Sequence, residues 1–406
     1  MIEPRRRSIV ETCDVAIIGA GPYGLSAAAH LRPLKGLDTL VFGEPMSFWE
    51  RSMPAGMRLL SPSATCHIAD PANRLNLDIY RELNTRNSEN HDLQDHLQVA
   101  DFIKYGHWFH QEAGVRADRR KVVRVDLASK GYQVTLEDGE TLRAGRVVVA
   151  GGIQPFVHRP KVFEGLPSSL VAHTSEQYEY GKFRDKEVLV IGGGRSSIEA
   201  AVFLREAGAH VEVLIRNAGI GSPNPTLDWL KSRSWISIFY GKGGVGPPGI
   251  SHIVQRPNLY RRLPRSTQDS WDKRATRTKF IYHHLPGPHN ISVHRGRSIV
   301  QARIEGDRLR LRLNDGVERT VDHVVLGTGY CVNVGLYKFL SPLILKRLDV
   351  ADGYPRLDSG FETSLAGLHF LGAPAAWSFG PLMRFVAGTE FASRALKQRI
   401  LRAQKR

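Results

Sequence analysis

A glycine-rich turn near the N-terminus constrains the fold of this chain more than any other feature. The apolar run 14–18 leads into Gly19, Gly21 and Gly24, and small residues typical of a helix follow. The spacing G-x-G-x-x-G between a strand and a helix is typical of a dinucleotide-binding turn. Its first glycine permits the tight turn, the second lets the backbone approach a pyrophosphate, and the third lets helix and strand pack closely. We therefore predict that these three glycines bind a dinucleotide.

The same pattern recurs in the middle of the chain. The apolar run 187–191 is followed by G-x-G-x-x-S, with Gly192, Gly194 and Ser197 at the three key positions. This second turn lies 192 − 19 = 173 residues after the first. It predicts a second dinucleotide site with the same construction.

A β-meander is predicted behind each turn. The two meanders carry Asp-Gly turns at 138–139 and 315–316, which are 315 − 138 = 177 residues apart. Two nearly equal offsets indicate duplication of a whole unit. The predicted fold class is therefore α/β, with two Rossmann-like dinucleotide-binding domains, each with a β-meander, and the second inserted into the first.

A late strand and helix complete the first unit. The apolar run 368–371 ends at Gly372, and a helical pattern extends from Pro381 to about Arg402. The glycine- and proline-rich region 217–286 is too long for a plain connection and predicts an excursion with helices, such as 271–283, that forms a candidate lid. The predicted domains are an FAD-binding domain at 1–155 and 326–406, and an inserted NADPH-binding domain at 156–325.

The charge at the second site favours NADPH over NADH. The strand 211–215 ends in Arg216, where an acidic residue would accept the ribose hydroxyls of NADH. An arginine there pairs instead with the 2′-phosphate of NADPH, and Arg195 in the glycine turn is predicted to add to that contact.

The cysteine and histidine content and the distribution of apolar residues exclude several classes of protein. Cys13, Cys66 and Cys331 are widely spaced without a C-x-x-C pair, so we expect buried apolar residues and neither a disulfide scaffold nor a redox dithiol. No stretch of 18 apolar residues and no secretory signal is visible, which predicts a cytoplasmic protein. No histidine has metal-ligand spacing, so no metal is predicted.

One strand end carries a family resemblance. The stretch Asp322–Tyr330 is similar to the D-x-x-x-(F/L)-A-T-G-Y motif of N-hydroxylating and flavin-containing enzymes, with Gly327 in place of alanine. Thr328 and Gly329 complete the motif beside the predicted cofactor linker. Together with the duplication, this stretch resembles the class B flavin-dependent monooxygenases of the two-dinucleotide-binding flavoproteins, a group that includes flavin-containing, N-hydroxylating and Baeyer–Villiger monooxygenases.

Two further segments support the resemblance with departures. Phe163, Gly165, His173 and Tyr178 are similar to the F-x-G-x-x-x-H-x-x-x-(W/Y) linker fingerprint, although the spacing is longer, so His173 is equally well an inter-domain structural residue. The segment 49–58 resembles W-x-R-x-P-G-x-R beside the flavin. The resemblance implies that Trp49 lies at the cofactor, and that Arg51 or Arg58 stabilises reduced flavin unless both are surface residues.

The resemblance also implies roles at the edges of the flavin. The segment from Ser61 to Asp70 occupies the place of the chain that covers the isoalloxazine ring, which makes Ser61 a candidate active-site residue. Glu44, one residue later than usual, is the candidate acceptor for the ribose hydroxyls of FAD. After Gly372 the chain continues with Ala-Pro, where disulfide reductases have an aspartate. This departure counts against a disulfide reductase as the alternative to a monooxygenase.

The implied activity is insertion of one oxygen atom from O₂ into a small organic substrate, at nitrogen, sulfur or a carbonyl, through a flavin C4a-(hydro)peroxide formed with FAD and NADPH. The alternative is an NAD(P)H-dependent flavoprotein reductase that passes electrons to a carrier. The formal charge of +16 left a third hypothesis, a basic protein that binds nucleic acid or membrane. No nucleic-acid-binding motif accompanies the charge, so no such partner is predicted, and the basic C-terminal tail predicts at most a weak peripheral membrane contact. Oligomeric state is not readable from the sequence.

Overall fold

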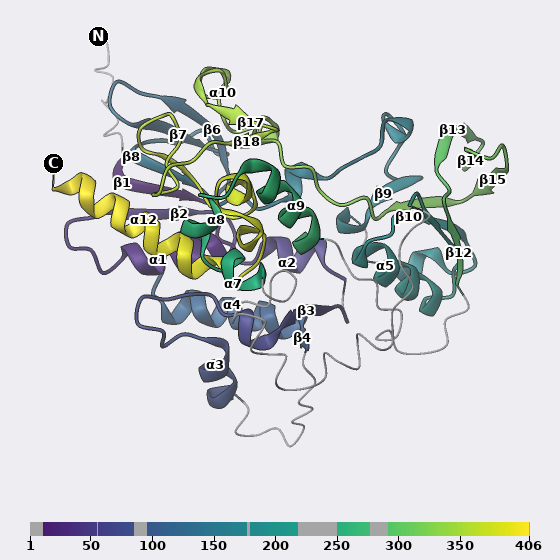
Figure 1. Ribbon diagram of the computed structural model, residues 1–406, viewed down its shortest axis with the longest axis horizontal. Coiled ribbons are helices and arrows are strands. Elements are labelled where there is room, and N and C mark those ends of the chain that lie inside the picture. Colours follow the sequence, from purple (N-terminus) through teal and green to yellow (C-terminus); the bar gives the residue numbers. More distant parts are fainter. Residues whose placement is uncertain are drawn as a thin grey trace, which may run out of the picture.

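The computed structural model describes residues 11–54, 56–84, 96–176, 179–217, 250–276 and 291–405. Two α/β units lie beside each other (Figure 1). The unit on the left contains both ends of the described chain, and the unit on the right is built from its middle. The predicted insertion of one Rossmann-like unit into another is therefore confirmed.

A parallel sheet forms the centre of the first unit. Strand β1 (Glu11–Ile18) lies between β2 (Thr39–Phe42) and β8 (Thr141–Val149), and β5 (Ala117–Asp118) extends the sheet beyond β2. The second half of β8 pairs in parallel with β19 (Leu368–Phe370), the predicted closing strand. The last four residues of β1 are buried, which explains their continuous apolar run.

The predicted first meander is joined to this sheet. Strands β6 (Val122–Leu127) and β7 (Tyr132–Leu136) pair antiparallel with each other, and β7 pairs with the first half of β8. One long strand, β8, therefore belongs to the meander at its start and to the parallel sheet at its end.

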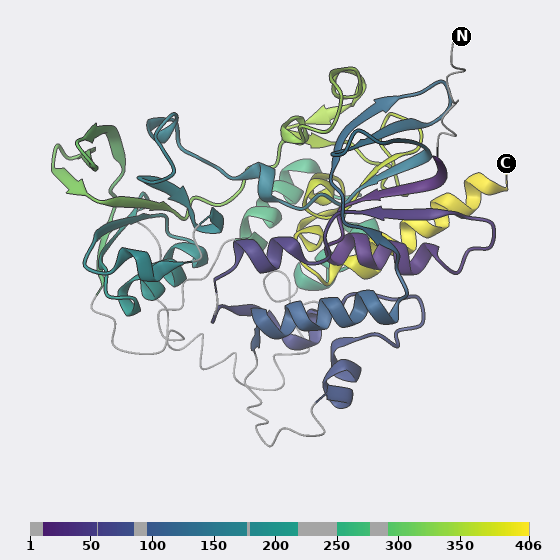
Figure 2. The same ribbon diagram turned by 180° about the vertical axis from the view of Figure 1, so that it is seen from behind.

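Helices cover the sheet of the first unit. Figure 2 shows α1 (Pro22–Leu31) and α4 (Val99–Glu112) on the same side of the strands. The C-terminal helix α12 (Gly388–Gln404) packs along α1, and the Oγ atoms of Ser26 and Ser393 lie 2.8 Å apart. The helix predicted from Pro381 begins later than expected, because residues 381–384 form a separate 3₁₀ turn before the chain bends into α12.

The second unit has its own parallel sheet. Its strand order is β12 (Ser292–Arg295), β11 (His210–Ile215), β10 (Glu187–Ile191), β16 (His323–Leu326) and β9 (Val171–His173). Helix α5 (Arg195–Glu206) follows the second glycine turn and packs on β10 and β11.

The second meander differs from the first. Strands β13 (Ile299–Glu305), β14 (Arg308–Leu313) and β15 (Glu318–Val321) form a separate antiparallel sheet. Strand β15 ends at Val321 and β16 begins at His323, and the carboxylate of Asp322 between them accepts a hydrogen bond of 2.7 Å from the backbone N–H of Glu187. The two units therefore have the same order of elements. Only in the first unit does one of the described strands, β8, belong both to the meander and to the parallel sheet.

Two crossing segments connect the units. The backbone N–H of His158 donates to the Gly329 carbonyl at 2.9 Å, and the N–H of Cys331 donates to the Phe156 carbonyl at 2.8 Å.

The remaining helices and strands are α2 (Ser47–Ser52), β3 (Arg58–Pro62), α3 (Leu77–Asn84), β4 (His96–Gln98), α7 (Ile250–Val254), α8 (Pro257–Tyr260), α9 (Arg265–Thr276), α10 (Pro342–Arg347), β17 (Val350–Ala351), β18 (Tyr354–Pro355) and α11 (Ala376–Phe379).

The predicted excursion is described only in part. The helix expected at 271–283 begins earlier, at Arg265 in α9, and residues 277–283 lie outside the described residues, as does most of the candidate lid.

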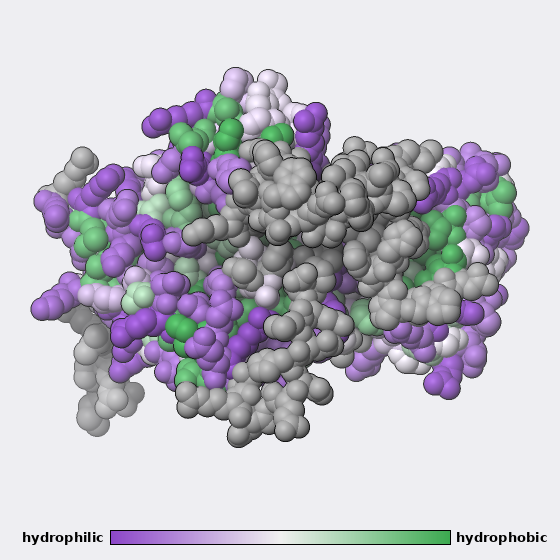
Figure 3. Space-filling model, turned by 60° about the horizontal axis from the view of Figure 1, so that its bottom comes forward, coloured by the Kyte–Doolittle hydropathy of each residue, from purple (hydrophilic) through white to green (hydrophobic). Residues whose placement is uncertain are grey.

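On the face in Figure 3 the described surface is mainly hydrophilic, with small hydrophobic areas. Among the described residues, no helix has the length and apolar character needed to cross a membrane.

Candidate functional site

The first glycine turn is closed at its first and third glycines, Gly19 and Gly24, and open at its second, Gly21. The N–H of Gly19 donates to the Phe42 carbonyl at 2.8 Å, which places the turn against the end of β2. A Cβ at Gly19 or Gly24 would lie closer than 3.0 Å to a backbone carbonyl oxygen, whereas a Cβ at Gly21 would have no atom within 4 Å. The open position precedes the N-terminus of α1, where free N–H groups favour an anion. This shape fits a pyrophosphate.

Tyr23 connects this turn to the C-terminal helix, a contact that no sequence pattern indicated. Its hydroxyl donates to the carbonyls of Met383 and Phe385 at 3.0 and 2.9 Å, and burial raises its pKa, so it remains a neutral donor. A Cβ at Gly388, the first residue of α12, would collide with the Tyr23 hydroxyl. The N-terminus of α12 therefore packs against the Tyr23 side chain, which belongs to the first turn of α1. Gly372, predicted at the cofactor, lies beside the Tyr23 ring.

The predicted ribose ligand and one predicted flavin cation contact each other. Glu44 follows β2, and its carboxylate is paired with the guanidinium of Arg51, whose side chain is 60% exposed. Trp49, also predicted at the cofactor, packs edge-on against Phe102 with ring centroids 4.7 Å apart. In this structure Trp49 is thus a packing residue of the α2–α4 contact, and Arg51 is held at the surface.

Arg58 and Ser61 both lie on β3, which pairs with β4. The carbonyl of Arg58 accepts a hydrogen bond from the guanidinium of Arg195 in the second unit, and the carbonyl of Ser61 lies 3.8 Å from the Sγ of Cys66. The segment that the resemblance placed beside the flavin therefore also contacts the second unit.

The second glycine turn repeats the construction of the first. Ser197 is fully buried, and its hydroxyl donates to the Gly327 carbonyl at 3.0 Å. A Cβ at Gly192 or Gly327 would collide with this contact, whereas a Cβ at Gly194 would have no atom within 4 Å. Ser197 and Gly327, predicted as cofactor residues, thus close the packing between α5 and β16, and the open position is again the second glycine.

The two arginines predicted at a nucleotide phosphate have different surroundings. Arg195 Nε donates to Glu199 Oε1 at 2.7 Å, so its guanidinium is bound to this carboxylate and to the Arg58 carbonyl. Burial raises the pKa of Glu199, and the charge of Arg195 opposes that change. Arg216 is exposed directly after β11, at the carboxyl edge of the sheet. Of the two, Arg216 keeps the surroundings that the phosphate prediction requires.

The linker fingerprint lies at the carboxyl edge of the second sheet. His173 ends β9, is buried, and its Nδ1 lies 2.8 Å from the Ser175 hydroxyl. Burial lowers its pKa to about 4, so it is neutral near pH 7. The Thr328 hydroxyl, beyond β16, donates to the His158 carbonyl and so ties the two crossing segments together. Tyr178, the last residue of the predicted fingerprint, lies outside the described residues.

The cysteines only partly match the prediction of buried apolar residues. Burial raises the pKa of Cys13 to about 12 and that of Cys66 to about 11, whereas Cys331 is exposed. The prediction was wrong for Cys331, because this residue lies on a crossing segment between the units and not on a core element.

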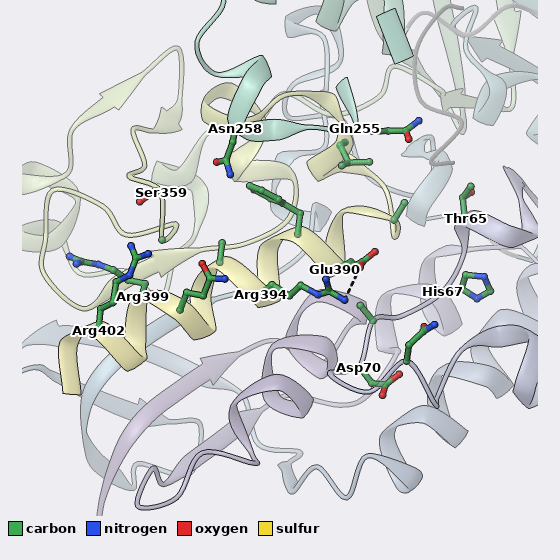
Figure 4. Close-up of a pocket in the computed structure, with 18 residues that line it drawn as sticks. Thr65, His67, Asp70, Gln255, Asn258, Ser359, Glu390, Arg394, Arg399 and Arg402 are labelled. Atoms are coloured by element: carbon green, nitrogen blue, oxygen red, sulfur yellow. Dashed lines mark ion pairs between the residues drawn. The ribbon is translucent and has the colours of Figure 1, made fainter. Parts of the chain in front are cut away.

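A cavity of about 770 Å³ lies along α12 (Figure 4). One wall comes from the segment 65–73, the opposite wall from residues 255–258 and 359–360, and the floor from α12. Leu382 and Ala387, which line it, flank in sequence the Met383 and Phe385 carbonyls that accept hydrogen bonds from Tyr23. Part of the segment that follows Ser61 and part of the excursion, residues 255–258, thus line one cavity.

Comparison with known proteins identifies the family. A family model described as pyridine nucleotide-disulphide oxidoreductase matches residues 16–238, which is 223 of the 406 residues. The chain belongs to this family. The predicted membership of the two-dinucleotide-binding flavoproteins is thereby confirmed. Within the family, a catalytic dithiol is not available from a C-x-x-C motif, because the three cysteines are far apart in sequence.

Characterised relatives of this oxidoreductase include oxygenating enzymes. It is 28% identical over 294 residues to an FAD-dependent urate hydroxylase of Xanthomonas campestris, covering 70% of this chain and 60% of that protein. It is 27% identical over 349 residues to an indole-3-pyruvate monooxygenase of Oryza sativa, covering 78% and 77% of the two chains. The chain therefore spans about three fifths of the hydroxylase.

Solved structures show the same fold over nearly the whole chain. Ornithine hydroxylase of Pseudomonas aeruginosa superimposes with a TM-score of 0.73 at 16% identity, covering 96% of this chain and 100% of that one. A bacillithiol disulfide reductase of Staphylococcus aureus superimposes with a TM-score of 0.64 at 20% identity, covering 98% and 100%. Both likenesses establish the fold, which serves oxygenases and reductases alike.

Proposed function

We propose that this protein is an FAD- and NADPH-dependent monooxygenase that inserts one oxygen atom from O₂ into a small organic substrate, at nitrogen, sulfur or a carbonyl. The observation that carries the proposal is the pair of glycine turns, each open at its second glycine and each at the carboxyl edge of a parallel sheet. Two such turns in one chain suit electron transfer between two dinucleotides. The oxygenating relatives favour a monooxygenase over a reductase.

The first turn fits FAD. Gly21 leaves room for the pyrophosphate, and the N-termini of α1 and α12 supply N–H groups and positive dipole ends. Glu44 would accept the ribose hydroxyls after exchanging its partner Arg51, which would then be free to approach the cofactor. Bound FAD supplies the redox and oxygen chemistry, so the chain needs no acid–base triad of its own.

The second turn fits a nicotinamide nucleotide. Gly194 leaves the space for its pyrophosphate at the N-terminus of α5, and Arg216 is the residue proposed to bind the 2′-phosphate of NADPH. We propose domain boundaries at 155/156 and 325/326, close to the two crossing segments that hydrogen-bond to each other.

The cavity along α12 is the proposed substrate site. It lies along the helix whose first residue, Gly388, packs against the hydroxyl of Tyr23, and it offers both polar walls and the ring of Phe391. Ala395→Trp would fill it, whereas Ala403→Trp changes the same helix outside the lining. We expect Ala395→Trp to raise the KM for substrate without slowing reduction of the flavin by NADPH, and Ala403→Trp to alter neither.

One experiment separates the monooxygenase from the reductase. Purified enzyme with FAD is supplied with NADPH and a panel of amines, sulfides and ketones, and NADPH consumption, hydrogen peroxide and product masses are recorded. A substrate that gains one oxygen atom with little peroxide supports the proposal. Electron transfer to quinones or carrier proteins, with no oxygenated product from any substrate class, would assign the reductase alternative.

A further inference from the structure

Arg195 forms a contact between the two units that neither glycine turn explains. It follows Gly194 directly, as the first residue of α5, and its guanidinium reaches across to the backbone carbonyl of Arg58 on β3. We propose that Arg195 is a positioning residue, which holds the nucleotide-binding unit against the flavin-binding unit in the arrangement that hydride transfer requires. This inference rests on the proposed function.

Glu199 holds Arg195 in place. Arg195 Nε and Nη2 lie 2.7 and 2.6 Å from the same oxygen, Glu199 Oε1, and the Glu199 side chain is only 11% exposed. The second oxygen, Oε2, is buried without a partner among the described residues, so the carboxylate depends on Arg195 for its charge balance. An arginine suits this place because one planar guanidinium bonds a carboxylate and a carbonyl at once.

The same face of α5 makes a second contact with the first unit. Arg195, Glu199 and Phe203 are spaced four residues apart and therefore line one face of the helix. A Cβ at Gly56 would lie 3.7 Å from the Phe203 ring, so the chain just before β3 also lies against this face. Residues 56–58 and the stripe on α5 thus form one interface.

The position of this interface explains how the Arg195 contact would affect hydride transfer. One side is the helix that begins at the second dinucleotide turn, and the other is the segment whose sequence resembles the chain beside the flavin. A small change in their relative position would change the distance between the two cofactors. Misplacement of reacting groups by about 1 Å can slow a reaction about 100-fold.

Arg195→Ala tests the proposal, and Arg205→Ala is its matched control. Arg205 lies on the same helix, but its guanidinium donates to the Ala209 carbonyl within its own unit, at 3.3 Å. Hydrogen exchange in the protein without nucleotide should rise in a peptide covering 56–62 for Arg195→Ala only. At saturating NADPH or NADH, the rate of flavin reduction should fall about 10- to 100-fold, with the dissociation constant of the nucleotide changed less than about twofold.

A double variant tests whether Glu199 acts through Arg195. Glu199→Gln should slow flavin reduction less than Arg195→Ala, and the combination should be no slower than Arg195→Ala alone, because both changes break one contact.

Unchanged hydrogen exchange at 56–62 in Arg195→Ala overturns the inference. So does weaker binding of NADPH alone with a normal reduction rate, which would assign Arg195 to the phosphate. A wild-type flavin that neither nucleotide reduces overturns the proposed function and the positioning role with it, while the exchange result still reports on the contact.

Discussion

Two glycines of the first turn should separate folding from cofactor binding. A Cβ at Gly24 would lie well within 3.0 Å of the Gly19 carbonyl oxygen, whereas a side chain at Gly21 would point into open space, with φ of −80°. Gly24→Ala should therefore destabilise the protein, and Gly21→Glu should fold normally but bind FAD much more weakly.

The magnitudes follow from these two environments. Overpacking costs up to about 3 kcal/mol, and alanine regains about 1 kcal/mol in a helix, so Gly24→Ala should lose about 2 kcal/mol. That corresponds to a Tm about 4–8 °C lower for a unit of this size. For Gly21→Glu, a carboxylate would replace the pyrophosphate at the N-terminus of α1. Loss of a charge-assisted contact of about 3 kcal/mol weakens FAD binding about 150-fold.

Thermal denaturation of the apoproteins followed by circular dichroism measures the first effect, and titration with FAD followed by flavin fluorescence measures the second. Gly181→Glu is the control, because a Cβ at this glycine also has no atom within 4 Å but the residue belongs to neither glycine turn. A Gly21→Glu protein that binds FAD as tightly as the wild type would refute the assignment of the first turn. A Gly24→Ala protein with an unchanged Tm would refute the packing argument.

Three further predictions follow from single residues. Arg216→Ala should raise the KM for NADPH about 10- to 150-fold and leave that for NADH nearly unchanged, and equal effects on both would remove the phosphate role. Burial lowers the pKa of His323 to about 4, so between pH 6.5 and 4 the unfolded chain binds a proton that the folded chain does not. Its contribution to the free energy of unfolding should therefore fall by about 2 kcal/mol from pH 7 to 5, and urea unfolding of His323→Asn should show a pH dependence weaker by that amount. Iodoacetamide should label Cys331 in the native protein and Cys13 and Cys66 only after denaturation, which mass spectrometry of the labelled peptides checks. Cys331→Ser should keep both flavin reduction by NADPH and steady-state NADPH consumption, whereas loss of consumption with flavin reduction intact would point to a thiol-based reductase.

The duplicated architecture was predictable because its signals are local. Each glycine turn lies between an apolar strand and a helix of small residues, and these patterns depend on backbone geometry within about ten residues. The closing strand 368–370 was also visible as an apolar run, and the structure pairs it with β8 as expected. The start of α12 was less predictable, because Pro381 suits the first turn of a 3₁₀ helix as well as that of an α-helix.

The candidate site was less readable from the sequence because its contacts join distant residues. Arg195 was assigned to a phosphate from its place in the turn, yet its partners are a glutamate one helical turn away and a carbonyl 137 residues earlier in the chain. Tyr23 bonds to carbonyls 360 and 362 residues later. Carbonyl groups carry no sequence signal, so no spacing rule indicates such partners.

The sequence alone thus determined that the chain contains two dinucleotide turns, one unit inserted in the other, and which glycines each turn requires, since steric limits on a tight turn act locally. Only the tertiary structure decided which glycine of each turn remains open, that Ser197 closes the second turn, and that Arg195 contacts β3. These properties depend on how close separate segments approach, and that distance is set by the packing of the whole molecule.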